Sequence, residues 1–133
     1  MDAAIKDVGA VILFVEDLAR SKAFYRDLLG LDVQFEDDES VGFTIKGLAF
    51  IVLQVDRARV QLQDEPTATP AAGATAFLTS FTDNVDALHA DLAGRGVSFF
   101  QHPADQPWGV RTAYFKDPDG HVWEIAQAIE HQG

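Results

Sequence analysis

Two kinds of hydrophobic spacing alternate along the chain. Residues 8–15 form a β-branched and apolar run, VGAVILFV, which is typical of a buried strand. The next segment, 16–30, carries apolar side chains at helical spacing and ends at Gly30, which suits the left-handed residue after a helix. Three strand-like runs follow, LDVQFE, SVGFTIKG and GLAFIVLQV. The first half of the chain therefore predicts one βαβββ module.

The second half repeats this order. TAFLTSF predicts a strand over 75–81, and TDNVDALHADLAG predicts a helix over 82–94, with Asp83 as its N-cap and Asp86 in its first turn. Three more strand-like runs follow, GVSFFQ, VRTAYFK and HVWEIAQ. The halves also align by position, since LLGLDVQF matches LAGRGVSF and GLAFIVL matches GHVWEIA. We interpret this likeness as an internal duplication of the module.

The two predicted modules are joined by a segment poor in large apolar residues. We predict module one over 1–60, a linker rich in Pro, Ala and Thr over 61–73, and module two over 74–129. The chain has 133 residues, of which 47% are hydrophobic, so a single compact domain over 1–133 is expected. One such module has too little core to fold alone, so two must pack together, within the chain or across a dimer.

Composition excludes several classes of function. The chain has no cysteine, which excludes disulfides, thiolate metal sites and cysteine nucleophiles. The formal charge of −11, from 21 acidic and 10 basic residues, disfavours nucleic acid and anionic membranes and favours a cationic partner. The N-terminus resembles no signal peptide and no apolar run is long enough to span a membrane, so a cytoplasmic protein is expected. There is no dinucleotide fingerprint, phosphate loop or nucleophile elbow.

The closing segment, WGVRTAYFKDPDGHVWEIAQ, carries the candidate site residues. Glu124 stands in an otherwise apolar strand, where a carboxylate would need a partner or water. Arg111 and Tyr114 lie on opposite faces of the preceding strand, so at most one shares a face with Glu124. Trp108 follows a proline-containing stretch, QHPADQP, predicted to be a loop, and its ring could stack on a ligand. The sequence DPDG is typical of a tight turn and predicts one between the two strands.

This closing segment, together with FVEDLARSKAFYRDLLGLDV and DNVDALHADLAGRGV, resembles the vicinal oxygen chelate superfamily. The superfamily includes glyoxalase I, extradiol dioxygenases, fosfomycin-resistance enzymes and bleomycin-resistance proteins. The resemblance spans nearly the whole chain. It implies an α+β fold of two βαβββ modules that form a cup-shaped mixed β-sheet, often in a homodimer, with a small-molecule site inside the cup.

The resemblance also implies where a divalent metal would bind in members that use one. The ligands would come from the first and fourth strands of each module, at positions occupied here by Ala10, Ile51, Ala76 (or Phe77, one residue further) and Glu124. One carboxylate among hydrocarbon side chains cannot form a tight site. We therefore predict no metal and no other cofactor.

The four histidines do not restore that site. His121 lies three residues before Glu124, a spacing that places the two on opposite faces of a strand. His89 falls in a predicted helix, His102 in a predicted loop and His131 in the tail. These last three are interpreted as ordinary surface residues.

We predict a metal-independent binding protein of the bleomycin-resistance type, which sequesters an aromatic or cationic compound in its cup. The predicted ligand-binding residues are Glu124, Trp108, Arg111, Tyr114 and Phe43. One alternative is an enzyme, a glyoxalase-like lyase or dioxygenase, that uses Glu124 with a metal. Another is a non-catalytic dimeric interaction module whose cup is filled by its own phenylalanines, Phe43, Phe50, Phe99 and Phe100. Fold alone does not decide among the three.

Overall fold

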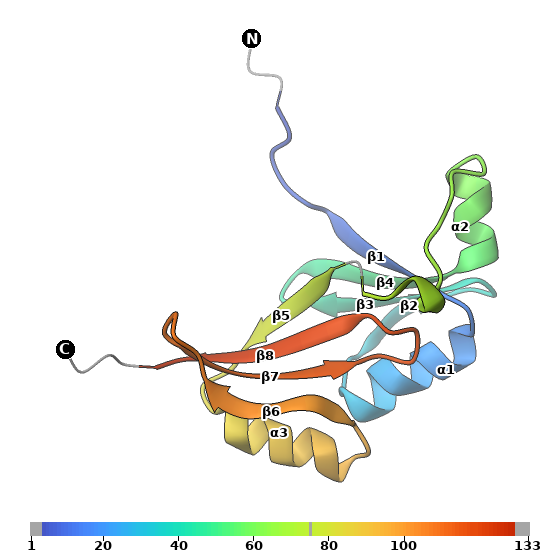
Figure 1. Ribbon diagram of the computed structural model, residues 1–133. Coiled ribbons are helices and arrows are strands. Elements are labelled where there is room, and N and C mark those ends of the chain that lie inside the picture. The colour runs from blue at the N-terminus through green and yellow to red at the C-terminus, as the bar shows by residue number, and fades with distance from the viewer. Residues whose placement is uncertain (1–3, 75, 130–133) are drawn as a thin grey trace. The chain divides into compact units, whose positions relative to one another are not determined.

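The computed structural model describes residues 4–74 and 76–129, and it divides into two compact units (Figure 1). The boundary falls between Thr67 and Ala68, inside the predicted linker. Each unit contains one four-stranded sheet within the described residues. No helix among these residues has the length and apolar character needed to cross a bilayer.

The first unit has the predicted βαβββ order with one added helix. Its elements are β1 (Ala10–Val15), α1 (Leu18–Ala23), the π-helical turn η1 (Phe24–Leu28), β2 (Val33–Glu36), β3 (Ser40–Ile45), β4 (Leu48–Gln54) and α2 (Val55–Gln61). The strand order is β1-β4-β3-β2, with β1 parallel to β4 and the other neighbours antiparallel. The sequence did not predict α2, whose first residue, Val55, was assigned to a strand.

The second unit repeats this topology. After the short 3-10 helix η2 (Pro70–Ala72) come β5 (Phe77–Phe81), α3 (Val85–Gly94), β6 (Phe99–Asp105), β7 (Val110–Lys116) and β8 (Val122–Ala128). The order is β5-β8-β7-β6, again with one parallel pair, β5 and β8. The predicted α+β fold of two βαβββ modules is therefore confirmed.

Two local predictions in the second unit are wrong. The N-cap of α3 is Asn84, whose side chain accepts a hydrogen bond from the backbone N–H of Ala87 at 3.0 Å, and not Asp83. The predicted loop around His102 is part of β6, which continues to Asp105. A strand can include Pro103 there because β6 lies at the edge of the sheet, where a missing N–H costs little.

The core of the first unit lies between α1 and η1 on one side and the sheet on the other. Tyr25 is fully buried, and its ring contacts Phe50 at 5.0 Å and Phe43 at 6.0 Å between centroids. Phe43 is itself buried. It therefore belongs to the core beneath the helix.

In the second unit, contacts with α3 identify the two faces of the sheet. Arg111 of β7 binds Asp86 of α3, and Gln127 of β8 accepts a hydrogen bond from the N–H of Val85 at the start of that helix. Side chains alternate between the two faces along a strand. Arg111 and Gln127 face α3, so the even-numbered residues of β7 and β8 point away from it. Tyr114 and Glu124 are among them, and they define the face described next.

Candidate functional site

Glu124 lies in the middle of a row of three side chains that crosses three neighbouring strands. Its register partners are Thr79 on β5 and Tyr114 on β7. Residues directly opposite one another on paired strands have Cβ atoms about 4.5–5.5 Å apart and share a face. Strand pairing alone therefore brings the carboxylate and the two hydroxyl groups together.

Both oxygens of Glu124 accept hydrogen bonds from this row. The Thr79 hydroxyl donates to Oε1 at 2.7 Å, and the Tyr114 hydroxyl donates to Oε2. Glu124 is only 8% exposed, so these donors replace much of the water that a free carboxylate would bind. A carboxylate oxygen can accept more than one hydrogen bond, which leaves capacity for a donor from a ligand.

The Tyr114 hydroxyl is held in its neutral, donating form. Its hydrogen bond to Glu124 raises the pKa of Tyr114 most, and burial and the negative charge of Glu124 raise it further. The neutral hydroxyl therefore adds no charge of its own beside the carboxylate. A cation or a strong hydrogen-bond donor is the natural partner for such a group.

Aromatic rings flank the carboxylate on the same face. The Phe77 ring meets Tyr114 edge-on at 6.1 Å, and the Phe100 ring lies tilted against Tyr114 at 6.0 Å. Phe77 is 58% exposed and Phe100 is 49% exposed, so both present ring surface to solvent. The Lys116 ammonium lies 5.2 Å from the Phe100 centroid, within cation–π range. We call Thr79, Glu124, Tyr114, Phe77 and Phe100 the Glu124 site.

Arg111 lies on the opposite face, where it has a structural role. Its guanidinium makes two hydrogen bonds of 2.9 Å to Asp86 on α3 and one of 3.0 Å to Asp105 on β6. These hydrogen bonds to Asp86, and then to Asp105, raise the pKa of Arg111 above its usual range. The prediction that Arg111 and Tyr114 occupy opposite faces is confirmed, and Tyr114 is the one that accompanies Glu124.

Two other predicted ligand residues lie elsewhere. Trp108 is 67% exposed in the turn before β7, beyond the end of the strand that carries Tyr114. Phe43 and Phe50 pack in the core of the first unit, against Tyr25. Phe99 packs against His89 and Phe115 in the second unit. Of the four phenylalanines proposed to fill the cup, only Phe100 lies on the Glu124 face. Phe43 is buried in the core and is therefore not exposed to a ligand.

Sequence reasoning missed the role of Thr79. A threonine in an amphipathic strand is ordinary, and its contact with Glu124 depends on the parallel pairing of β5 with β8. The available signal was the alternation of Phe77, Thr79 and Phe81, which places all three on one face of a strand. The sequence therefore showed which side chains share a face of this strand. It did not show which residue of the neighbouring strand lies beside Thr79.

The residues at the family's metal positions do not fit a metal ion. Ala10 is paired with Ala49, and Ile51 lies between Ile12 and Gly42, so these rows contain no side-chain donor. Ala76 adds none. Within residues 4–74 and 76–129 there is also no group of three or more His, Cys, Asp or Glu side chains that could hold an ion. Glu124 alone cannot supply the several oxygen or nitrogen ligands that a divalent ion needs.

His121 serves the turn before β8. Its Nδ1 lies 2.7 Å from Oδ2 of Asp117, and Oδ1 of the same carboxylate accepts hydrogen bonds from the backbone N–H groups of Asp119 and His121. Burial lowers the pKa of His121, but the hydrogen bond and the charges of Asp117 and Asp119 outweigh it, so the pKa is raised. These contacts stabilise the DPDG turn.

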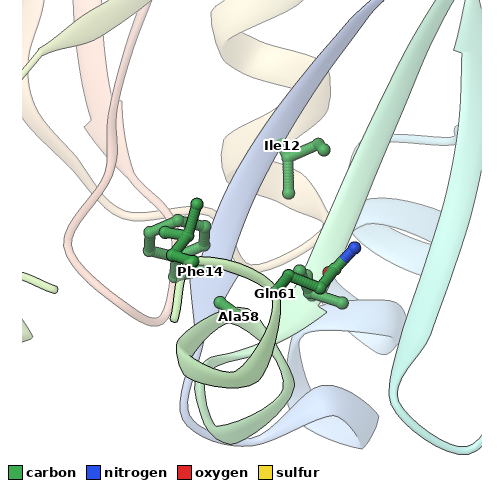
Figure 2. Close-up of a pocket in the computed structure, with 6 residues that line it drawn as sticks. Ile12, Phe14, Ala58 and Gln61 are labelled. Atoms are coloured by element: carbon green, nitrogen blue, oxygen red, sulfur yellow. The ribbon is translucent and has the colours of Figure 1, made fainter. Parts of the chain in front are cut away.

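The first unit has a separate, apolar pocket of about 220 Å³ between β1, the end of β4 and α2 (Figure 2). Ile12 and Phe14 come from the strand, and Ala58 and Gln61 come from the helix. Its remaining lining residues are Leu53 and Leu62. Gln61 is the one polar side chain in this lining, so the pocket lacks the convergent polar groups that fix a ligand's orientation.

The fold and the sequence both match one known family. The family model of the Glyoxalase/Bleomycin resistance protein/Dioxygenase superfamily matches residues 7–125, and the chain belongs to this superfamily. Among curated proteins, it is similar to the uncharacterized protein YraH of Bacillus subtilis, with 27% identity over 88% of this chain and 94% of YraH. It is also similar to the metallothiol transferase FosB of Lysinibacillus sphaericus, with 23% identity over 91% of this chain and 82% of FosB.

Solved structures support the fold. A glyoxalase/bleomycin resistance protein/dioxygenase from Nocardioides matches with a TM-score of 0.87 and 24% identity, over 98% of this chain and 88% of the other. A lactoylglutathione lyase from Agrobacterium tumefaciens matches with a TM-score of 0.73 and 20% identity, over 93% and 95% of the two chains. At these identities the likeness establishes the fold alone.

Proposed function

We propose that the protein binds a small aromatic or cationic molecule at the Glu124 site without the help of a metal. The observation that carries this proposal is a buried carboxylate, supported by two hydroxyl donors and flanked by two half-exposed phenylalanine rings. Apolar surface with a few convergent polar groups is the usual composition of a ligand site. The chemistry matches a compound that combines a flat ring with a protonated amine.

Each part of the site would contribute differently to binding. A protonated amine on Glu124 would form a charge-assisted hydrogen bond, which is about twice as strong as a neutral one. The rings of Phe77 and Phe100 would bury apolar ligand surface, at about 25 cal/mol per Å² before association costs. Cation–π attraction to these rings would add about 0.5–2 kcal/mol for a well-placed ammonium group. The carboxylate therefore determines the class of ligand, and the rings add affinity.

The test is calorimetric titration of the full-length protein with a panel of planar aromatic amines and their uncharged analogues. Glu124→Gln keeps the shape of the side chain but removes its charge, so we expect at least a tenfold loss of affinity for the amines. Glu65→Gln removes the same charge from an exposed loop position and is the matched control, with an expected change of less than twofold. Equal losses in both variants, or no binder across the panel, would contradict the proposal.

The alternative is a metal-dependent enzyme, which the similarity to FosB and to lactoylglutathione lyase brings into consideration. The hydrocarbon side chains of Ala10, Ile51 and Ala76 argue against it. Elemental analysis of purified protein separates the two hypotheses. One equivalent of a metal that is lost in Glu124→Gln, together with a catalytic activity, would favour the enzyme.

A further inference from the structure

His89 of α3 and His102 of β6 face each other on the helix side of the second unit. Nε2 of His89 lies 3.1 Å from Nδ1 of His102, and the two rings are nearly perpendicular, with centroids 5.3 Å apart. The His89 ring also packs on Phe99, with 4.4 Å between centroids. A helix and the neighbouring edge strand thus bring together two imidazoles that are thirteen positions apart in the chain.

We propose that this pair binds a divalent late first-row transition-metal ion such as Zn²⁺, Ni²⁺ or Cu²⁺. Imidazole nitrogen binds such ions at about 2.0–2.1 Å, so two adjacent ligands of one ion have nitrogens about 2.9–3.4 Å apart. The observed separation of 3.1 Å lies inside this range. Binding would replace the hydrogen bond between the rings. The ring that donates this bond would carry its proton on its other nitrogen instead, so that both facing nitrogens offer a lone pair to the ion, and water would complete the coordination.

The rings have room for this adjustment. His102 is exposed and His89 is partly exposed, so a small tilt of each ring disturbs little of the core. The helix and the strand hold the two backbones near each other before any ion arrives. Less side-chain freedom is therefore lost on binding than for two histidines on mobile loops.

The charges near the pair favour a cation. Asp86 lies one helical turn before His89, and Asp105 lies on the same strand as His102. Both carboxylates bind the single guanidinium of Arg111, which leaves one net negative charge in the cluster. The whole chain carries a formal charge of −11, which further favours the approach of cations.

The chemistry of the two donors determines which ions should bind. Imidazole suits Zn²⁺, Ni²⁺ and Cu²⁺, and affinity for a given nitrogen site rises to its maximum at Cu²⁺. Mg²⁺ and Ca²⁺ prefer oxygen ligands and should not bind. The site lies on the opposite side of the sheet from Glu124, so it is distinct from the family's metal position.

The experiment uses full-length, tag-free, chelator-treated protein titrated with Cu²⁺ and Zn²⁺, and with Mg²⁺ as the inactive ion. Electron paramagnetic resonance of the wild type with one equivalent of Cu²⁺ should show two imidazole nitrogens. His89→Asn and His102→Asn should each weaken Cu²⁺ affinity at least tenfold and reduce the count to one nitrogen. His121→Asn, which removes a histidine from the DPDG turn, and Glu124→Gln should change the affinity less than twofold.

A second measurement does not depend on affinity. An ion that binds the folded state stabilises it, so Zn²⁺ should raise the unfolding midpoint of the wild type but not that of the His89→Asn/His102→Asn double variant. The proposal is overturned if the double variant binds Cu²⁺ as tightly as the wild type. It is equally overturned if Glu124→Gln or His121→Asn abolishes binding, or if the wild-type spectrum shows fewer than two imidazole nitrogens.

Discussion

At the scale of single residues, Glu124 and Tyr114 depend on each other's charge state. The carboxylate raises the pKa of Tyr114, chiefly through the hydrogen bond between them. We predict that Glu124→Gln returns the pKa of Tyr114 toward the ordinary value of about 10. A spectrophotometric titration of tyrosinate absorbance, with Tyr114→Phe subtracted to remove the signal of Tyr25, measures this shift. An unchanged midpoint in Glu124→Gln would show that burial alone sets it.

The raised pKa of Tyr114 also determines how the stability of the folded protein changes with pH. The folded pKa of Tyr114 lies above its unfolded value, so the stability contributed by its hydrogen bond is complete below about pH 10. It is lost as the pH rises through the folded pKa, because the unfolded state then releases the proton more readily. The hydrogen bond is therefore fully formed throughout the physiological range.

The sequence predicted only part of the arrangement of Arg111, Tyr114 and Glu124. The two-residue period of a strand established from sequence that Arg111 and Tyr114 point to opposite faces. It could not tell which one joins Glu124, because that depends on the register of β7 with β8 and on the position of α3. Asp86 and Asp105, which bind Arg111 on the helix side, come from other elements. Contacts between segments that are distant in the sequence therefore determine which of Arg111 and Tyr114 lies beside Glu124.

At the scale of elements, the start of α3 offers a direct comparison of two adjacent residues. Asn84 caps the helix through Ala87, whereas Asp83 precedes the cap. We predict that Asn84→Ala destabilises the protein by about 1 kcal/mol, the usual cost of losing a side-chain cap. Asp83→Ala is the matched control and should change the free energy of unfolding by less than about 0.5 kcal/mol. Urea denaturation measures both, and a larger cost for Asp83→Ala would restore the sequence-based assignment.

The elements that sequence reasoning missed share a physical cause. Residues 55–61 form α2 although they directly follow β4 without a turn signal, and Ala58 is buried where this helix meets the apolar pocket. Pro103 suggested a loop, but the edge position of β6 accommodates it. In both cases the deciding influence is a neighbour in space. Local propensity is too weak to override such contacts.

At the scale of the whole molecule, the repeat made the topology predictable. Two halves with the same order of elements implied two modules with the same strand pairing, and both sheets have that pairing. The fold could be derived because it depends on hydrophobic periodicity, which the chain displays twice. The chemistry of the site could not be derived in the same way, because Thr79, Tyr114 and Glu124 meet only after three strands have paired.

The net charge leads to a prediction about the kinetics of binding. A formal charge of −11 should speed the arrival of a cationic ligand, and salt should weaken this effect. The screening length falls from about 30 Å at 0.01 M salt to about 8 Å at 0.15 M. We expect the association rate constant of an aromatic amine to fall severalfold over this range, while that of its uncharged analogue changes little.

Stopped-flow fluorescence can follow this reaction when fluorescent aromatic compounds are chosen as the ligands. The dissociation rate constant should respond much less to salt, because a contact with the buried Glu124 is screened less than the long-range attraction that guides the approach. The uncharged analogue is the control for changes in the protein itself. If both compounds show the same salt dependence of association, the acidic surface does not guide the ligand, and the selectivity for cations must come from Glu124 alone.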